Sequence, residues 1–398
     1  MPAGELSIQR QGEAGPRLLI IEPYANASHR ALVAGLMAHL PARWTALTLP
    51  GRHFRWRLRG AAAYLAQAAA AILAEPWDGL VCSAMLNLAE LKGLAPGLAP
   101  APALAYFHEN QLAYPAPGRA DAAQQKRDLF LAWSNLTTAQ AAKIVAFNSE
   151  HHRQEFLAAG RALLAQLPDA APTGLMEAIE RKSRVLPVPI DPDQAGSLAA
   201  GPARAPRSGP LRILWNHRWH HDKDPEAFFA ALFALDRAGL AYELAVLGPA
   251  SGRPPAIFAE ARASLAGHIA QWGAAADRAA YWRWLLWADL AVSTARQEYQ
   301  GLSVAEAAAA GCRLLLPRAL VYPELYPAQC LYEPGHLAEA LAALATLAAL
   351  AAAPAAARQP DEPTRRAGLA LAWPAQAPAW RAAMADLLAG ASSTPPAP

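Results

Sequence analysis

The sequence predicts two doubly wound α/β domains joined by a linker. Short, continuous apolar runs recur along the 398-residue chain and alternate with longer stretches of helical periodicity. This alternation is typical of parallel sheets covered by helices on both faces. Near the middle, residues 192–210 are rich in Pro, Gly, Ala, Ser and Arg, which is the composition of a linker.

Composition narrows the class of protein. A hydrophobic content of 54% with 17% charged residues excludes a disordered chain. The net charge of +3 does not by itself indicate a nucleic-acid partner, although it permits a local basic patch. Cys82, Cys312 and Cys330 are far apart and form no CxxC pair, as is typical of buried thiols in a reducing compartment. We expect a cytoplasmic protein without a signal peptide or membrane span, and the Ala- and Pro-rich composition suggests a bacterial source.

In the amino-terminal half, we expect residues 1–16 to be flexible and residues 17–195 to form the first domain. The apolar runs predicted as strands are Arg17–Glu22, Thr45–Leu49, Gly79–Ser83, Ala103–Phe107, Ile144–Asn148 and Val185–Val188. Helical patterns lie between them, for example at residues 28–40, 60–74 and 121–140. Residues 196–210 are the predicted linker.

Residues 211–351 are predicted to form the second domain. Its expected strands are Leu211–Trp215, Glu243–Leu247, His268–Trp272, Leu290–Ser293 and Arg313–Leu316. Asp224 followed by Pro225 predicts a helix start, with an acid at the N-cap and Pro at the first helical position. Residues 352–390 hold a Pro- and Ala-rich segment and a final amphipathic helix from Trp373 to Leu388, and residues 391–398 are expected to be a disordered tail. Two such domains usually bind a ligand in the cleft between them.

Two carboxylates in the second domain indicate a sugar-nucleotide site. Glu298 follows the strand that ends at Ser293, and Glu306 lies just inside an Ala-rich helical run, with Gly301 between them. Amides at the helix start suit a diphosphate, and the carboxylates suit hydroxyl groups. The alternative is that Ser303 and Glu306 form a capping box that only closes the helix start.

Two cations follow the first strand of the same domain. Arg218 and Lys223 lie on the loop after Trp215, and a guanidinium with an ammonium suits a diphosphate. Fixed positive charge there would stabilise the leaving group of a transfer reaction. His217, His220 and His221 have spacing that can bind zinc, but they lie on a loop without a third-ligand motif, so we expect no metal.

Polar residues end two predicted strands of the first domain. His108, Glu109, Asn110 and Gln111 directly follow Phe107, where their burial would be costly unless they line a cleft. The alternative is a polar turn with a helix cap. The loop after the first strand adds Asn26, Ser28 and His29, at the usual place of close ligand approach.

The segment from Arg52 to Arg59 reads as an RNA-binding patch. Arg52, Arg55, Arg57 and Arg59 interleave with His53, Phe54 and Trp56, so guanidinium groups could contact phosphates while aromatic rings stack on unpaired bases. The alternative is a solvated approach to a helix with Trp56 packed inward.

Arg218 and Lys223 followed by Glu298-x7-Glu306 resemble the donor signature of retaining glycosyltransferases of the GT-B fold, family 4. Taken with further motifs, most of residues 17–335 resembles the tRNA-queuosine alpha-mannosyltransferase family. The motifs are Glu22…Ser28-His29, Leu49-Pro50 with the Arg/Trp run, Ser83…Leu86-Asn87-Leu88, Tyr106–Pro115, Phe147–Ser149, Leu214–Glu226 and Val321–Glu324. Where the family has a Gly-Gly pair in the first loop, this chain has Asn26-Ala27.

The resemblance implies a GT-B fold: two Rossmann-like domains facing across a cleft, with the C-terminal helix packing back toward the N-terminal domain. It implies transfer of mannose from GDP-mannose to queuosine in the anticodon loop of tRNA-Asp, without a metal or other cofactor. The candidates for catalysis are Arg218, Lys223, Glu298 and His108. Those for donor binding are Gly301, Leu302, Ser303, Glu306, Trp272, Gly273 and Gly248, and those for acceptor binding are Asn26, Ser28, His29, Arg52, Arg55, Trp56, Arg57, Glu109, Asn110 and Gln111.

Other functions remain open at this point. The enzyme could use another nucleotide sugar, or act on a lipid or polysaccharide, since an Arg-rich run can also meet anionic lipid. A non-catalytic RNA-binding protein with the GT-B fold is a third alternative. The partners we expect are tRNA and a nucleotide sugar, without integral membrane association.

Overall fold

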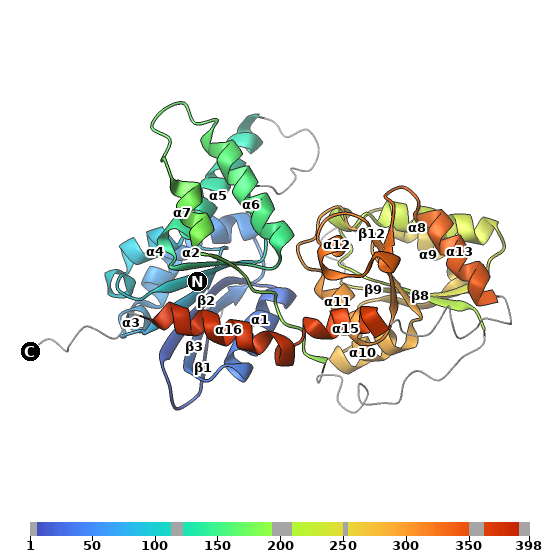
Figure 1. The fold of residues 1–398 in the computed structure, drawn as a ribbon, viewed down its shortest axis with the longest axis horizontal. Helices are drawn as coiled ribbons and strands as arrows, with labels where there is room; N and C mark the ends of the chain where they lie inside the picture. The colour runs from blue at the N-terminus through green and yellow to red at the C-terminus, as the bar shows by residue number, and fades with distance from the viewer. Residues whose placement is uncertain (1–5, 113–121, 193–208, 250–253, 350–361, 390–398) are drawn as a thin grey trace, which may run out of the picture. The chain divides into compact units, whose positions relative to one another are not determined.

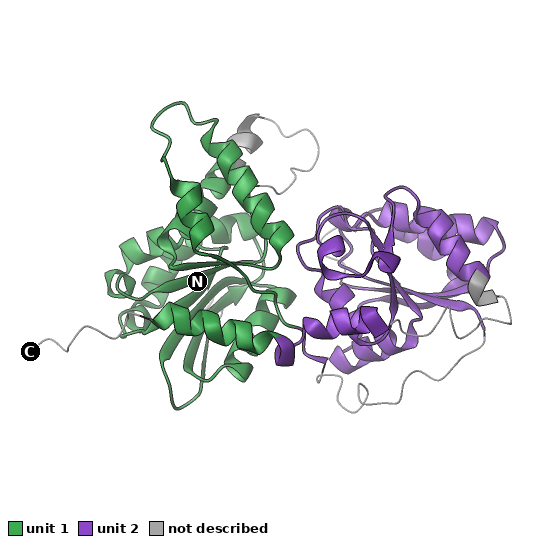
Figure 2. Ribbon diagram, viewed as in Figure 1, with its two compact units in different colours: residues 1–189, 376–398 green, residues 190–375 purple. Residues whose placement is uncertain are grey.

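The structure, a computed structural model, describes residues 6–112, 122–192, 209–249, 254–349 and 362–389. It divides into two compact units, residues 1–189 with 376–398 and residues 190–375 (Figure 2). The predicted tail from residue 391 and nearly all of the predicted linker lie outside the described residues, as does most of the Pro- and Ala-rich segment.

Unit 1 is built on a seven-stranded sheet in the order β1-β3-β2-β4-β5-β6-β7 (Figure 1). All neighbouring strands are parallel except β1 and β3. The strands are β1 (Ser7–Gln11), β2 (Arg17–Ala25), β3 (Arg43–Pro50), β4 (Gly79–Ser83), β5 (Ala103–Phe107), β6 (Ile144–Phe147) and β7 (Ser183–Val185). The helices are α1 (Ala27–His39), α2 (Phe54–Ala68), α3 (Ala70–Leu73), α4 (Leu88–Leu94), η1 (Pro96–Leu98), α5 (Ala122–Ala141), α6 (Glu150–Leu164) and α7 (Leu175–Arg181).

Five of the predicted strands of unit 1 are present, because each is a buried apolar run between turn residues. The sixth was predicted at Val185–Val188, but β7 ends at Val185 and begins at Ser183, on residues that are not buried. β1 corrects the prediction that residues 1–16 are flexible: Ser7–Gln11 pair antiparallel with β3 at the sheet edge. All five of these residues are exposed, so the segment shows none of the apolar patterning from which strands are predicted. The sheet and its covering helices enclose a core that includes Leu19, Leu80, Phe107 and Phe147.

The last helix, α16 (Trp373–Leu388), packs on unit 1, as expected for the C-terminal helix. Trp380 is fully buried, its ring stacks on Tyr106 at 5.6 Å, and its indole N–H donates to the carbonyl of Pro187 at 3.1 Å. Lys143 Nζ donates to the carbonyl of Leu387 at 3.1 Å. Residues from the end of the sequence therefore complete the first unit.

Unit 2 is built on a six-stranded parallel sheet in the order β10-β9-β8-β11-β12-β13. The strands are β8 (Leu211–Asn216), β9 (Tyr242–Leu247), β10 (Ile269–Gly273), β11 (Leu290–Val292), β12 (Arg313–Pro317) and β13 (Leu331–Tyr332). The helices are η3 (His221–Lys223), α8 (Pro225–Arg237), α9 (Ile257–Ser264), η4 (Ala266–His268), α10 (Arg278–Trp287), α11 (Leu302–Ala309), α12 (Tyr322–Leu325), η5 (Ala328–Cys330), α13 (Leu337–Ala349) and α15 (Glu362–Ala370).

The five strands predicted for this unit are present, and so is the helix start at Asp224. Its Oδ1 accepts the N–H of Ala227 at 3.3 Å, with Pro225 at the first helical position. Several elements were not predicted, among them β13 and α15. β13 has only two residues, too few for a periodic pattern, and α15 follows a Pro- and Ala-rich segment that read as irregular. Among the described residues, no helix is both long and apolar enough to cross a membrane.

Candidate functional site

The predicted donor residues lie on two loops of unit 2 at the carboxyl ends of neighbouring parallel strands. β8 ends at Asn216 and leads to Arg218 and Lys223, whereas β11 ends at Val292 and leads to Glu298 and then to α11. β8 and β11 pair directly, so the two loops meet at one edge of the sheet. The Thr294 hydroxyl donates to the carbonyl of Lys223 at 2.7 Å and fixes one loop to the other.

Lys223 and Glu298 are in direct contact. Lys223 Nζ lies 3.0 Å from Glu298 Oε2 and 3.2 Å from Asp222 Oδ2, and it also donates to the carbonyl of Gln297 at 3.0 Å. Arg218 joins the same group, since its Nη2 lies 3.5 Å from Asp222 Oδ2. The structure thus brings together three of the four predicted catalytic residues and adds Asp222, which the sequence argument did not single out.

This group is formally neutral, with two cations and two carboxylates. Burial disfavours the charged form of Lys223, but Glu298 and Asp222 outweigh that effect and raise its pKa. Burial likewise opposes the charged form of Glu298, and Lys223 outweighs it, so the pKa of Glu298 is lowered. Both groups are therefore charged at neutral pH. The Lys223 side chain is 9% exposed and that of Arg218 is 48% exposed, so Arg218 is the cation with access to a ligand.

Glu306 belongs to a second polar group beside the first. Its carboxylate pairs with Arg278 of α10, and it accepts the hydroxyl of Tyr281 at 2.7 Å. Asn216 Nδ2 at the end of β8 holds this second group against α11 by donating to Tyr281 Oη at 3.1 Å and to the carbonyl of Ser303 at 2.9 Å. Sequence reasoning missed Arg278 and Tyr281. The available signal was the N-cap Asp277 shortly after β10, which marks the start of another helix near the strand ends.

The capping-box interpretation of Glu306 is wrong. α11 starts at Leu302 with Gly301 as its N-cap, at φ 77°, and no side chain caps it by a hydrogen bond. Glu306 is the fifth residue of that helix and turns to α10 instead. Among the described residues the first turn of α11 is thus left without a side-chain cap, next to the loop that carries Glu298, which suits an anion.

The three histidines of the β8 loop do not form a metal-ligand set. His217 is buried and its Nδ1 lies 3.5 Å from Ser303 Oγ. His220 Nδ1 faces Asp222 Oδ1 at 2.5 Å, and His221 is exposed. Burial, and then Lys223, lower the pKa of His217 to about 4, so this ring is neutral at neutral pH.

The predicted donor residues Trp272, Gly273 and Gly248 lie at the ends of β9 and β10. Trp272 packs against Trp219 with ring centroids 5.5 Å apart. Gly248 has φ 130°, and a Cβ there would lie 1.9 Å from the carbonyl oxygen of His217. The β8 loop and the end of β9 therefore approach as closely as a glycine allows.

Unit 1 gathers a buried polar cluster at the carboxyl ends of β2, β4 and β5. His29 Nδ1 lies 2.8 Å from Glu22 Oε2, and Ser83 Oγ donates to Glu22 Oε1 at 3.0 Å. His108 stacks on His29 with ring centroids 3.7 Å apart. Burial, and then His29 and His152, lower the pKa of His108 well below its usual value. His108 is therefore a neutral hydrogen-bonding group, and its Nε2 has no hydrogen-bond partner among the described residues.

Glu22, His29 and His108 place three potential ligand atoms within 4.8 Å of one another, so this set could in principle hold a metal ion. The two imidazole rings are stacked, with an interplanar angle of 19°. Because ring lone pairs lie in the ring planes, stacked rings direct them side by side and not at a shared point. The arrangement fits a stacked pair of rings better than a coordination site.

Of the remaining residues predicted to bind the acceptor, some form hydrogen bonds that shape their own loops, and others are partly exposed. Asn26 Oδ1 accepts the N–H of His29 at 3.1 Å and the hydroxyl of Ser28 at 2.9 Å, with φ −75°. The Asn26-Ala27 pair therefore starts α1 without left-handed backbone. Asn110 is fully buried and accepts the N–H of Leu112 at 3.1 Å, so it shapes the loop, and its binding role stays a prediction. Glu109 and Gln111 are half-buried.

The predicted RNA patch is helical, because α2 begins at Phe54 and not near residue 60. Trp56 is 65% exposed, so the interpretation with Trp56 packed inward is wrong. Arg57 is buried at 7% exposure and is not part of the surface, contrary to prediction, because helical periodicity turns it toward the sheet. Arg52 is exposed and Arg55 is half-buried.

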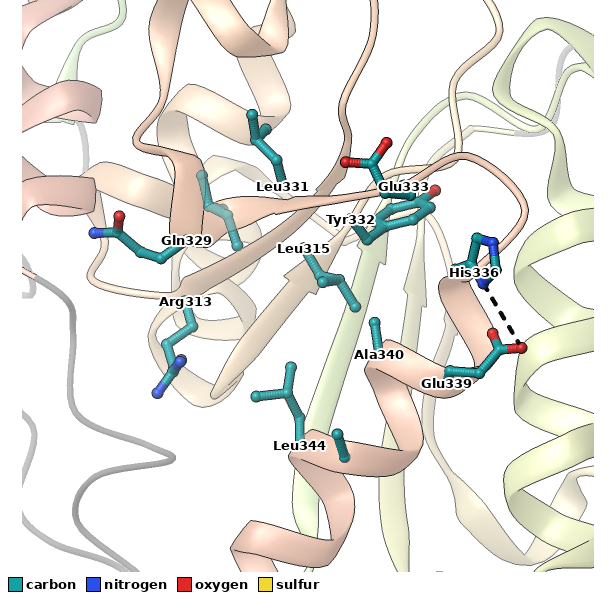
Figure 3. A pocket seen from close by; sticks show the side chains of 12 residues that line it. Arg313, Leu315, Gln329, Leu331, Tyr332, Glu333, His336, Glu339, Ala340 and Leu344 are labelled. Atoms are coloured by element: carbon teal, nitrogen blue, oxygen red, sulfur yellow. Dashed lines mark ion pairs between the residues drawn. The ribbon is translucent and has the colours of Figure 1, made fainter.

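A hollow of about 510 Å³ in unit 2 lies elsewhere, between β12, β13 and α13 (Figure 3). Arg313, Leu315, Tyr332, His336 and Glu339 are among its lining residues. None of the predicted donor residues lines it, so it does not belong to the candidate site.

Comparison with known proteins identifies the family of this chain. The family model described as tRNA-queuosine alpha-mannosyltransferase N-terminal matches residues 17–190. The tRNA-queuosine alpha-mannosyltransferase of Drosophila melanogaster is 32% identical over 328 residues, which cover 80% of this chain and 84% of that protein.

Solved structures show the same fold. An alpha,alpha-trehalose-phosphate synthase from Burkholderia vietnamiensis is 15% identical, with a TM-score of 0.64, 96% of this chain covered and 100% of that one. A sucrose-phosphate synthase from Thermosynechococcus elongatus is 17% identical, with a TM-score of 0.62, 94% of this chain covered and 100% of that one. At these identities the likeness shows the fold alone, and that fold is the predicted GT-B class.

Proposed function

Because the chain belongs to the tRNA-queuosine alpha-mannosyltransferase family, we propose that it transfers mannose from GDP-mannose to queuosine in the anticodon loop of tRNA-Asp. The observation that supports this most is the contact between Lys223 and Glu298, joined through Asp222 to Arg218, beside the first turn of α11. A nucleotide sugar offers a diphosphate for the cations and amides, and hydroxyls for the carboxylate.

We propose that unit 2 binds the donor. Arg218 would bind the diphosphate together with the first amides of α11, near Gly301, Leu302 and Ser303. Because Arg218 and Lys223 already face Asp222 and Glu298, a bound diphosphate would compete with these carboxylates for the cations. Glu298 would then be free to accept hydroxyl groups of the sugar, and Glu306, fixed by Arg278 and Tyr281, would accept those of the ribose.

The proposed reaction keeps the configuration of the sugar. The bond between the anomeric carbon and the diphosphate breaks first in an oxocarbenium-like transition state, and the leaving diphosphate gains negative charge that Arg218, Lys223 and the α11 amides stabilise. The queuosine hydroxyl attacks on the face that the diphosphate leaves, and a donor phosphate oxygen takes its proton. No step requires a metal ion. Unit 1, with Arg52, Arg55 and Trp56 on its surface, is the proposed tRNA-binding part, and the proposed location is the cytoplasm.

The decisive experiment is mass spectrometry of tRNA nucleosides after incubation with GDP-mannose and queuosine-bearing tRNA. The expected result is queuosine carrying one added hexose, with GDP released in equal amount. The same tRNA without queuosine is the matched acceptor control, and UDP-glucose is the donor control. Transfer to a lipid acceptor with unchanged tRNA, or transfer only from another nucleotide sugar, would contradict the proposal.

A further inference from the structure

Unit 1 has a surface hollow that the proposed reaction does not use. It measures about 520 Å³ and lies where α2, α4 and α5 meet, three helices that neighbour one another in Figure 1. Its lining residues include Arg59 of α2, Asn87 and Glu90 at the start of α4, and Phe130, Trp133 and Ser134 of α5.

The walls of this hollow are aromatic and exposed. Phe130 is 71% exposed and Trp133 is 36% exposed, which leaves large apolar faces in water. The guanidinium of Arg59 lies 5.8 Å from the centre of the Phe130 ring. An aromatic face beside a guanidinium is the combination that binds the flat face and the phosphate of an unpaired nucleotide.

The deeper lining is polar. Ser134 is 9% exposed, and its hydroxyl has no hydrogen-bond partner among the described residues. A buried hydroxyl without a partner costs free energy, and a ligand in the hollow would supply the partner. The exposed carboxylate of Glu90 disfavours an anion inside the hollow, but it can accept a hydrogen bond from an exocyclic amino group.

The hollow is connected to the His29 and His108 cluster through packed side chains of unit 1. Leu58, which lines the hollow, packs in a small apolar cluster with Met85 and Leu131 against Tyr24. Tyr24 in turn contacts the His29 ring edge-to-face at 5.7 Å. Asn135, next to Ser134, accepts the N–H of Gln111 at 2.8 Å, just after His108.

We propose that this hollow binds an unpaired base of the acceptor RNA, next to the nucleotide that is modified. The base would stack on Phe130 and Trp133, its polar edge would face Ser134, Asn87 and Glu90, and Arg59 would contact the adjoining phosphate. This inference rests on the proposed function for the identity of the ligand. It adds a second point of recognition on α5, separate from the Arg52–Trp56 segment of α2.

The test is binding of an anticodon stem-loop RNA measured by fluorescence anisotropy without any sugar donor. Phe130→Ala is expected to weaken binding by about five- to 150-fold, the range that corresponds to the loss of one base-stacking contact. Trp133→Ala should weaken binding to a similar extent. Leu94→Ala, at an exposed apolar position of α4 outside the hollow, is the matched control and should bind like the unchanged protein. Because Phe130 is so exposed, Phe130→Ala should unfold at the unchanged temperature.

A second arm identifies the base. Loop nucleotides of the RNA are replaced one at a time by abasic residues. One of these abasic RNAs is expected to bind the unchanged protein more weakly than the intact RNA does. The Phe130→Ala variant should bind that abasic RNA and the intact RNA with equal affinity. If Phe130→Ala and the unchanged protein bind every RNA equally, the hollow does not hold a base. If all abasic RNAs lose affinity alike, the contribution is not that of a base pocket, and the inference also fails.

The two proposals fail separately. The binding assay does not depend on sugar transfer. If the enzyme adds hexose to queuosine but Phe130→Ala binds RNA as tightly as the unchanged protein, only the base-pocket proposal is overturned. Conversely, a position-specific abasic effect without any hexose transfer supports the pocket and overturns the proposed reaction.

Discussion

At the scale of single residues, the site of unit 2 is a balance of charges. Arg218 and Lys223 face Asp222 and Glu298, so the ligand-free group carries no net charge that would attract a diphosphate from a distance. The cations can attract the diphosphate strongly only after it has displaced the carboxylates from them. This balance suits a group that stabilises charge during the reaction more than it binds the substrate.

Arg218→Ala is expected to lower kcat by about 100-fold or more while weakening GDP binding much less, because the charge it stabilises is greatest in the transition state. Steady-state kinetics of hexose transfer and calorimetric titration with GDP measure the two quantities. Arg237→Ala, an exposed arginine at the end of α8, is the control and should change neither. Equal losses in kcat and in GDP affinity would show that Arg218 only anchors the donor.

His217 should make the protein sensitive to acid. In the unfolded chain this histidine binds a proton below pH 6.5, whereas in the folded protein its pKa is about 4. The unfolded state therefore binds more protons between these values, and the folded state loses up to about 3 kcal/mol as pH falls through this window. Stability from this source is fully retained above pH 6.5.

His217→Gln removes that titration, so the urea midpoint of the variant should fall less steeply from pH 6.5 to 4 than that of the unchanged protein. The slope should not vanish, because the buried His108 and His152 also have lowered pKa values. His221→Gln, at an exposed position, is the control. Identical slopes for His217→Gln and the unchanged protein would contradict the lowered pKa.

At the scale of elements, the loop after β8 depends on one glycine at the end of β9. Gly248 combines φ 130° with a position where a Cβ would lie 1.9 Å from the carbonyl oxygen of His217. Gly273, at the end of β10, has φ 105°, but no atom of the described residues lies within 4 Å of its Cβ position. The two positions share the backbone strain that an alanine would bring, and only Gly248 adds a backbone clash.

Gly248→Ala is therefore expected to be more destabilising than Gly273→Ala. Backbone strain alone costs about 1–2 kcal/mol, and the clash at Gly248 should add at least as much again or force the β8 loop to move. Denaturant unfolding gives the stability of both variants, and GDP titration tests whether the loop has moved. Equal destabilisation by the two substitutions would mean that the loop yields without cost.

Sequence reasoning located elements that carry apolar patterning and missed those that do not. The central strands of both sheets are buried, and buried runs are legible in a sequence. β1 is exposed along its length, and β13 is very short, so neither has a pattern to detect. The error in the start of α2 had a larger effect. Because the helix begins at Phe54, Arg57 lies on a different face from Arg55 and Arg59, and it is buried.

The candidate site was predictable in part for a similar reason. Arg218, Lys223 and Glu298 share a motif spacing and follow strand ends, so the sequence could place them at one sheet edge. Their partners could not be predicted, because the pairing of Glu306 with Arg278 and Tyr281 depends on how α10 packs beside α11. The sequence also could not show that Asn110 is buried whereas the neighbouring Gln111 is only half-buried.

At the scale of the whole molecule, the chain passes from unit 1 to unit 2 and back again. Unit 1 consists of residues 1–189 and 376–398, and α16 supplies Trp380 to its interior. The stability of unit 1 therefore depends on residues at the far end of the sequence, while unit 2 is continuous along the chain.

Trp380→Ala should lower the free energy of unfolding of unit 1 by about 3–5 kcal/mol, as is usual for removing a buried tryptophan. Arg184→Ala is the matched control. Arg184 of β7 forms an exposed ion pair with Asp386 of α16, the helix that carries Trp380, and losing this pair costs less than about 1 kcal/mol. Hydrogen exchange resolved by peptide separates the two units. Faster exchange throughout unit 2 but not in unit 1 would contradict this assignment of α16.

The return of α16 also sets an order of events during synthesis. Domains usually fold as they leave the ribosome, beginning with the first. Here the first unit to emerge still lacks Trp380, so the face of Tyr106 that this ring covers has to wait until the entire second unit has been translated. The nascent chain thus exposes an unfinished apolar surface throughout the synthesis of the second unit, and a chaperone that shields such surfaces has its longest opportunity at that stage.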